Sequence, residues 1–217
     1  MSKKKVWTLC IAVAVLVCSV VVGTLAFLTD RDEVVNIFTV GNVAIKLDEA
    51  KVNPDGTVVE GADRVTANTY HLIPGATYVK DPTVTVLAGS ETSYIRLLVT
   101  IDNMADLNSI CDGNFTPENY VLGWNSAVWT YVGFTDNGDD TATYEFRYHT
   151  TVSTMDGNPL ALEPLFTHIQ VPGDISGEQL AMISNLTVKV EGHAIQAHSF
   201  ADDQEAWEAF AEQYANP

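Results

Sequence analysis

The sequence is poor in cysteine. Only three of its 217 residues are cysteines, and Cys111 is the only one beyond an apolar stretch at the start of the chain. No disulfide can therefore form within the rest of the chain, so its stability must come from a hydrophobic core and from hydrogen bonds between strands. A lone thiol could cross-link two chains, but a buried and inert cysteine is the commoner case.

Positive charge is scarce and unevenly placed. Lys3, Lys4 and Lys5 all precede the apolar stretch, and beyond Ala26 eight basic residues stand against 28 acidic ones, a net charge of −20. A surface this acidic repels nucleic acid and anionic lipid, so we expect no nucleic-acid partner. It is compatible with cation binding, although a solvated acidic surface is the simpler explanation.

Motifs that would indicate an enzyme are also missing. The chain has no HExxH metalloprotease motif, no GxSxG nucleophile motif and no glycine-rich phosphate loop. We therefore predict no catalytic residue. The histidines are expected to be structural rather than metal ligands; they are His71, His149, His168, His193 and His198.

The densest group of oxygen ligands is the run of residues 136–140. Calcium takes about six to eight oxygen ligands, and this run lacks the spacing of an EF-hand loop and its final acidic ligand. Asp136, Asp139 and Asp140 are the candidates for a calcium site, but a solvated hairpin tip is the simpler interpretation. No other cofactor is indicated.

The start of the chain has the features of an export signal. Three lysines form a positive region, and the next 21 residues carry no charge. Small residues at Thr24 and Ala26 occupy the −3 and −1 positions of a signal-peptidase site, which predicts cleavage between Ala26 and Phe27. The stretch is also long enough to remain as a membrane-spanning helix. Residues 1–26 are therefore predicted to be a signal peptide or a transmembrane segment, the only part expected to contact a membrane.

Alternation of apolar and polar residues predicts strands along most of the remaining chain. In residues 94–102, for example, the alternate apolar residues from Ile95 to Ile101 are expected to face the core, and Asn137-Gly138 predicts a hairpin. The predicted strands are residues 34–47, 70–73, 83–87, 94–102, 127–134, 141–151, 165–171 and 186–198.

The segments between these strands give fewer signals. Residues 48–67 are predicted to form an exposed loop that leaves the sheet. Residues 104–124 are predicted to be an irregular region with a short helix near Pro117. Gly192 predicts a bulge in the last strand. Ser176 with Gln179, and Asp202 with Glu205, have the spacing of helix N-termini.

These patterns favour an all-β fold. We predict an antiparallel β-sandwich, jelly-roll-like, with an N-terminal signal helix and a short C-terminal helix. The expected parts are residues 27–201 for the sandwich domain and residues 202–217 for the helix packed on it.

Four stretches of the chain carry a family resemblance. Residues 27–47 read FLTDRDEVVNIFTVGNVAIKL, and Pro74-Gly75 is followed after four residues by Lys80-Asp81. A strand follows at residues 94–101, and AIQAHSF then EAWEAF stand near the C-terminus. These features resemble the proteins exported with the alternate, SipW-type signal peptidase, a group that includes the biofilm fibre protein TasA and the camelysin-like proteins.

The resemblance implies a jelly-roll sandwich secreted by a Gram-positive bacterium, with an alternate signal peptidase as its partner during export. It also implies self-association, in which a freed N-terminal segment adds as a strand to the next subunit. Residues 27–40 are the candidate donor, and its candidate anchors are Val34, Val35, Ile37 and Phe38. The alternative is that this segment is the first strand of its own sandwich.

The sequence is also compatible with two other functions. The camelysin name implies a secreted metallopeptidase, although the chain has no recognisable zinc motif. A sandwich could instead be a carbohydrate- or host-binding module, for which Trp124, Trp129 and Tyr131 would be candidates if they were exposed; such residues more often pack in a core.

Overall fold

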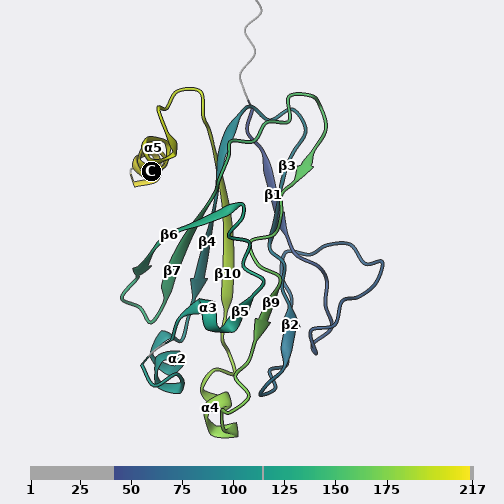
Figure 1. Cartoon of the computed structure of the whole chain (residues 1–217), viewed down its shortest axis with the longest axis vertical. Helices are drawn as coiled ribbons and strands as arrows, with labels where there is room; N and C mark the ends of the chain where they lie inside the picture. The colour runs from purple at the N-terminus through teal and green to yellow at the C-terminus, as the bar shows by residue number, and fades with distance from the viewer. Residues whose placement is uncertain (1–41, 114, 216–217) are drawn as a thin grey trace, which may run out of the picture. The chain divides into compact units, whose positions relative to one another are not determined.

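The computed structural model describes residues 42–113 and 115–215. These residues belong to the second of two compact units, Gly41–Pro217. They form mostly strands, arranged in three antiparallel sheets, with few helices (Figure 1), so the all-β prediction is confirmed. The predicted signal segment, its cleavage junction and the donor-strand anchors lie outside the described residues. Within the described residues, no helix is long and apolar enough to cross a membrane.

The largest sheet has the strand order β10-β4-β7-β6. Its central strand β4 (Ser93–Ile101) pairs with β10 (Val188–Gln196) on one side and with β7 (Ala142–Tyr148) on the other; β6 (Trp129–Asp136) follows β7. The alternate residues of β4 are buried as predicted, with Ile95, Leu97, Val99 and Ile101 at most 4% exposed. The strand therefore presents one continuous apolar face.

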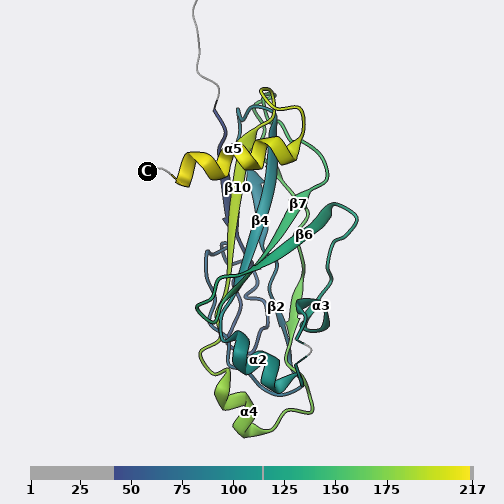
Figure 2. The same ribbon diagram turned by 90° about the vertical axis from the view of Figure 1, so that its left-hand side faces the viewer.

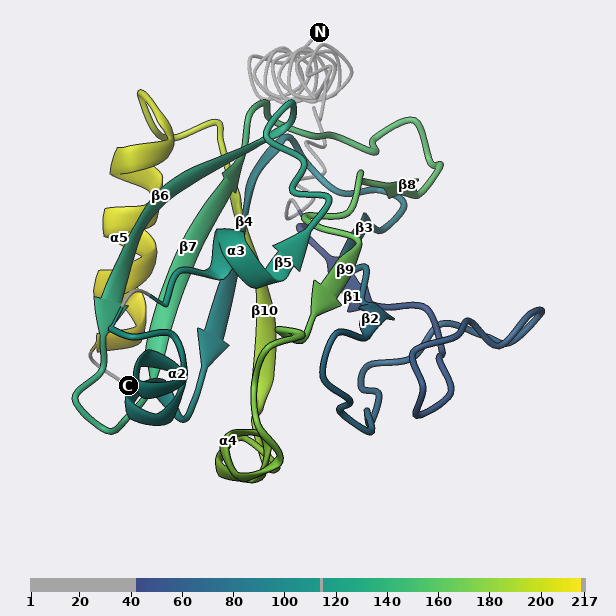
Figure 3. The same cartoon turned by 60° about the horizontal axis from the view of Figure 1, so that its bottom comes forward.

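Two smaller sheets supply the opposite side of the core. One contains β1 (Ile45–Asp48), β3 (Thr83–Val86) and β8 (Leu160–Ala161), and the other β2 (Thr77–Val79), β9 (His168–Gln170) and β5 (Val121–Leu122). Val84 and Val86 of β3 belong to the same buried cluster as the apolar residues of β4. Figure 3 shows the strands of both small sheets on the same side of the large sheet.

Four helices join or flank the sheets in the described residues: α2 (Met104–Ile110), α3 (Pro117–Tyr120), α4 (Gly177–Met182) and α5 (Asp203–Ala215). The capping box predicted for Ser176 and Gln179 is confirmed at α4. The α5 start is also confirmed, because the Asp202 carboxylate accepts a hydrogen bond of 3.0 Å from the Glu205 backbone N–H.

Three local predictions are wrong. Residues 70–73 form no strand, and residues 104–110 form the helix α2 rather than an irregular segment. Gly192 makes no bulge, because β10 pairs with β4 in unbroken register. A Cβ at this position would make only ordinary contacts with Ile45, Leu97 and Leu47, at 3.4–3.7 Å.

The segment that follows β1 was predicted to be exposed, and this is wrong at its first residues. Asp48 and Glu49 are each only 5% exposed. The Arg64 guanidinium lies 2.5 Å from the Asp48 carboxylate, and the Lys80 ammonium lies 2.5 Å from Glu49. A buried charge is tolerated when a partner of opposite charge compensates its lost hydration. These pairs fasten the segment to the strands beside it.

The helix α5 covers the face of the large sheet that points away from the core (Figure 2). Arg96 of β4 lies 4.4 Å from the ring centroid of the buried Trp207. Arg147 of β7 pairs with Asp203 at 3.0 Å, which offsets the like charge of Arg96 directly across the strand pair. Cation–π and ionic contacts therefore hold α5 on the sheet.

His193 of β10 takes part in this contact and is sensitive to protonation. Its ring stacks on Phe210 with centroids 4.9 Å apart, and its Nδ1 accepts a hydrogen bond of 3.2 Å from Arg96. Burial lowers the pKa of His193, and the Arg96 charge lowers it further, while Glu191 and Glu145 act in the opposite direction. The folded protein thus favours the neutral ring, since a protonated Nδ1 cannot accept the bond.

Breaking the buried pair of Lys80 and Glu49 should destabilise the fold. We expect Lys80→Met to lower the free energy of unfolding by about 3–5 kcal/mol, because Glu49 is left charged and buried. The control Lys46→Met removes an ion pair from a lysine whose side chain is 57% exposed, and it should cost less than about 1 kcal/mol. Urea unfolding measures both; equal losses for the two variants would show that burial of the pair is unimportant.

Acid should loosen the attachment of α5. The unfolded chain takes up a proton at His193 as the pH falls through the ordinary histidine range near 6.5, whereas the folded chain resists until a lower pH. The free energy of unfolding should therefore fall between pH 7.5 and pH 5.5, and fall less in His193→Gln. His198→Gln, at an exposed residue, is the matched control. The same pH dependence in all three proteins would disprove the role of His193.

Candidate functional site

The strand β6 is the last strand of the large sheet, and its outer edge has no strand partner among the described residues. It also carries three exposed apolar side chains: Tyr131 is 45% exposed, Val132 46% and Phe134 63%. We call these three residues the β6 patch. An unpaired strand edge with apolar side chains is a template for the addition of another strand.

A bulge brings the two aromatic residues of the β6 patch to one face. Tyr131 lies opposite Phe146 and Gly133 lies opposite Glu145, which leaves Val132 as the extra residue of β6. Without this bulge, strict alternation would place Gly133 rather than Phe134 on the core side. The apolar face of the sheet therefore continues to its edge.

Cross-strand aromatic contacts fix these side chains. Tyr131 lies 5.4 Å from Phe146, and Phe134 stacks on Tyr144 at 5.8 Å, measured between ring centroids. Burial against the sheet raises the pKa of Tyr131, and the Glu118 carboxylate adds to this effect. The patch is thus anchored on its inner side and is neutral around pH 7.

The opposite edge of the same sheet differs in chemistry. The strand β10 exposes Lys189 and Glu191, which pair at 3.0 Å, and none of its large apolar side chains is strongly exposed. Charged residues on an edge discourage the pairing of strands. By contrast, β6 has no charged residue before Asp136 at its end. Of these two edges, β6 is therefore the one suited to accept a strand.

The tip of the hairpin holds the candidate calcium ligands, and each has another partner. Asp136 accepts a hydrogen bond from the Gly138 backbone, and Asp139 accepts one from the Thr141 hydroxyl. Asp140 accepts from the Ala105 backbone N–H at 2.8 Å and so caps α2. Among the described residues, no group of three or more His, Cys, Asp and Glu side chains is placed to hold a metal ion.

The candidate aromatic residues for carbohydrate binding are not brought together on the surface. Trp129 is buried and donates a hydrogen bond to the Glu163 carbonyl, and Trp124 packs on Phe146. Only Tyr131 is strongly exposed. Cys111 is partly buried and lies within hydrogen-bond distance of the Tyr120 hydroxyl.

The sequence alone does not identify β6 as an edge strand. The lack of charge over residues 129–135 was not a specific signal, because the predicted strands at residues 70–73, 83–87 and 165–171 also contain no Asp, Glu, Lys or Arg. The order of strands in the sheet was the missing information. The donor-strand anchors Val34, Val35, Ile37 and Phe38 lie outside the described residues.

Comparison of the chain with protein-family models, with curated proteins and with solved structures finds no match in any of the three.

The cap that Asp140 provides for α2 can be tested directly. The backbone of Asp140 has a positive φ of 64°, a conformation that glycine and asparagine tolerate. We expect Asp140→Gly to remove the hydrogen bond to the Ala105 N–H, to lower the free energy of unfolding by about 0.5–1.5 kcal/mol and to speed hydrogen exchange in α2. Asp140→Asn keeps an oxygen acceptor and should remain within about 0.5 kcal/mol of the wild type. Slow exchange of α2 in Asp140→Gly would show that the cap is dispensable.

Proposed function

We propose that the protein is a secreted structural protein of the cell surface or biofilm matrix, and that it polymerises by strand addition. The incoming strand is the segment 27–40 of one subunit, and the acceptor is the outer edge of β6 in the next. In this proposal the three sheets make a jelly-roll-like sandwich, and an alternate signal peptidase frees the donor at Phe27.

The observation that carries the proposal is the outer edge of β6, which is uncharged as far as Thr135 and has no strand partner within residues 42–113 and 115–215, with the β6 patch beside it. An added strand satisfies the free backbone groups of this edge and removes apolar surface from water. Burial of apolar area contributes about 25 cal/mol per Å², so three half-exposed side chains supply a useful driving force. The partnered residues Phe146 and Tyr144 hold two of these side chains in place beforehand.

The chain supplies a donor of matching length and character. Residues 27–40 number 14, more than the eight residues of β6, and they are rich in β-branched and aromatic residues from Val34 onward. This segment directly precedes the described unit. Addition of each donor to the next subunit is a head-to-tail contact that does not close, so repetition builds a filament.

The resemblance of residues 27–47 to SipW-dependent exported proteins of the TasA group supports the same proposal. The acidic composition of the chain favours solubility, which a secreted protein needs. The Gram-positive source and the alternate peptidase rest on this resemblance.

The proposal predicts that assembly requires both partners of the contact. A protein that begins at Phe27 should form filaments as its concentration rises, seen by electron microscopy and sedimentation, whereas one that begins at Gly41 should stay monomeric. A synthetic peptide of residues 27–40 should bind the shorter protein. Equal assembly of the two proteins, or the absence of concentration dependence, would contradict strand addition between subunits.

Variants of the acceptor edge give the second arm of this test. Phe134→Lys places a charge on the β6 patch at a side chain that is 63% exposed. The monomer should stay folded, at a cost of about 0.5–1.5 kcal/mol for the lost stacking on Tyr144, while filaments are lost. Met155→Lys changes a side chain that is 59% exposed in a turn, and it should assemble normally. Loss of filaments in both variants would point to charge in general rather than to β6.

A further inference from the structure

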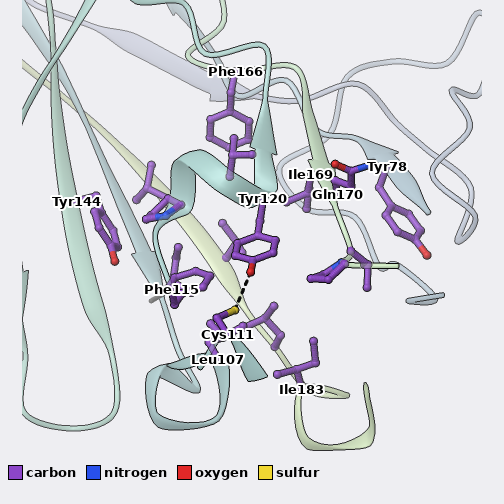
Figure 4. A pocket seen from close by; sticks show the side chains of 18 of the residues that line it. Tyr78, Leu107, Cys111, Phe115, Tyr120, Tyr144, Phe166, Ile169, Gln170 and Ile183 are labelled. Atoms are coloured by element: carbon purple, nitrogen blue, oxygen red, sulfur yellow. Dashed lines mark hydrogen bonds between the residues drawn. The ribbon is translucent and has the colours of Figure 1, made fainter. Parts of the chain in front are cut away.

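Cys111, the free thiol of the described residues, lies in an apolar setting. It lines a core pocket of about 90 Å³ together with residues of β4, β7 and β9 (Figure 4). None of the described residues that line this pocket has a charged side chain. The Cys111 Sγ lies 2.8 Å from the Tyr120 hydroxyl oxygen (Figure 4). Neither group is an electrophile, so this contact is a hydrogen bond and leads to no reaction.

The buried amine of Lys80, by contrast, has an electrophile beside it. The side chain of Lys80 is only 9% exposed, and its Nζ lies 2.5 Å from Oε2 of Glu49. The other oxygen of the same carboxylate, Oε1, accepts a hydrogen bond of 2.9 Å from Nδ2 of Asn68. One carboxylate therefore holds a primary amine and a carboxamide side by side, with one oxygen on each nitrogen.

The Asn68 amide is fixed by the backbone around it. Its Oδ1 accepts a hydrogen bond of 3.0 Å from the Val52 backbone N–H, and its Nδ2 also donates to the Ala50 carbonyl at 2.8 Å. An N–H on the carbonyl oxygen stabilises the negative charge that develops there when a nucleophile adds to Cγ. Because amine and amide are both held in place, little entropy is lost in bringing them together.

We propose that Lys80 and Asn68 join through an amide bond between their side chains, with Glu49 moving the protons and ammonia leaving. Burial disfavours separated charges, so the Lys80 ammonium gives a proton to Glu49 along their hydrogen bond and becomes a neutral, nucleophilic amine. The lone pair of Nζ forms a bond to Cγ of Asn68. Glu49 then gives its proton to Nδ2 and receives one from the attacking nitrogen. The Cγ–Nδ2 bond breaks and ammonia leaves, so no oxidant or outside reactant is needed.

The bond closes a covalent ring over residues 68–80, and the ion pair of Lys80 and Glu49 is the state before the reaction. A cross-link restricts the unfolded chain, as a disulfide does. A disulfide cannot supply this constraint here, because Cys111 is the only cysteine beyond the apolar stretch. The reaction is independent of strand addition, since neither Lys80, Glu49 nor Asn68 belongs to β6.

Digestion of the full chain with trypsin, followed by mass spectrometry, reports on the bond. Trypsin cleaves after Lys and Arg, so a free Lys80 gives the peptide 65–80. A linked Lys80 resists cleavage and gives the peptide 65–96, lighter by one ammonia, about 17 Da. An asparagine that cyclises with its own backbone also loses ammonia but leaves Lys80 open to trypsin. The missed cleavage and the mass loss together therefore identify the link, and we expect both in the wild type.

Matched variants separate the roles of the three residues. Lys80→Arg keeps the positive charge but removes the nucleophile, because an arginine side chain stays protonated, and the linked peptide should disappear. Lys46→Arg makes the same change at a lysine whose side chain is 57% exposed, and it should keep the link. Glu49→Gln retains both reacting groups but cannot move the protons, so the rate at which linked protein appears after synthesis should fall about 100-fold.

Two results would overturn the inference. If the wild type gives the peptide 65–80 and no mass loss, Lys80 and Asn68 do not react and the contact is an ion pair only. If Glu49→Gln forms the linked peptide as fast as the wild type, Glu49 does not transfer the protons. The wild-type digest needs no variant to fold, and it reads the same whether or not filaments assemble.

Discussion

Burial of the apolar face of β4 is the constraint on which the rest of the structure depends. This strand lies in the middle of the large sheet, and its alternate residues from Ser93 to Ile101 are almost fully enclosed. One small sheet brings Val84 and Val86 of β3 against that face, and the other contributes Val121 of β5 to the same buried cluster. The other face carries Arg96 and therefore needs the aromatic and acidic residues of α5. Once both faces are covered, the edges of the sheet are the parts of it at which a further strand can pair.

The two edges of the large sheet differ in charge and in apolar exposure, so only one of these two edges is suited to pair with a further strand. The edge at β10 carries charged residues, whereas β6 presents the β6 patch and an outer edge that has no strand partner in the described part of the chain. A net charge of −20 beyond Ala26 disfavours random association of such chains. An uncharged edge on an acidic protein can therefore accept a strand selectively, which suits ordered growth better than aggregation.

The local features of this fold were predictable from sequence, and the non-local ones were not. The alternation in β4, the hairpin at Asn137-Gly138 and the caps of α4 and α5 depend on neighbours in the chain, and the structure confirms them. The helix α2 was missed because its cap comes from Asp140, 35 residues away. Burial of Glu49 was missed because it needs Lys80. The edge position of β6 and the pocket follow from strand order and packing, which no local pattern encodes.

The most direct measurement of the central claim is hydrogen exchange of the β6 backbone. In dilute monomeric protein that begins at Phe27, alternate amides of β6 should exchange fast, because they face away from β7 and have no strand partner among the described residues. In concentrated, assembled protein the same amides should become protected, together with amides of residues 34–40, while β10 changes little. If assembled protein leaves the outer amides of β6 as exposed as in the monomer, strand addition at this edge is wrong.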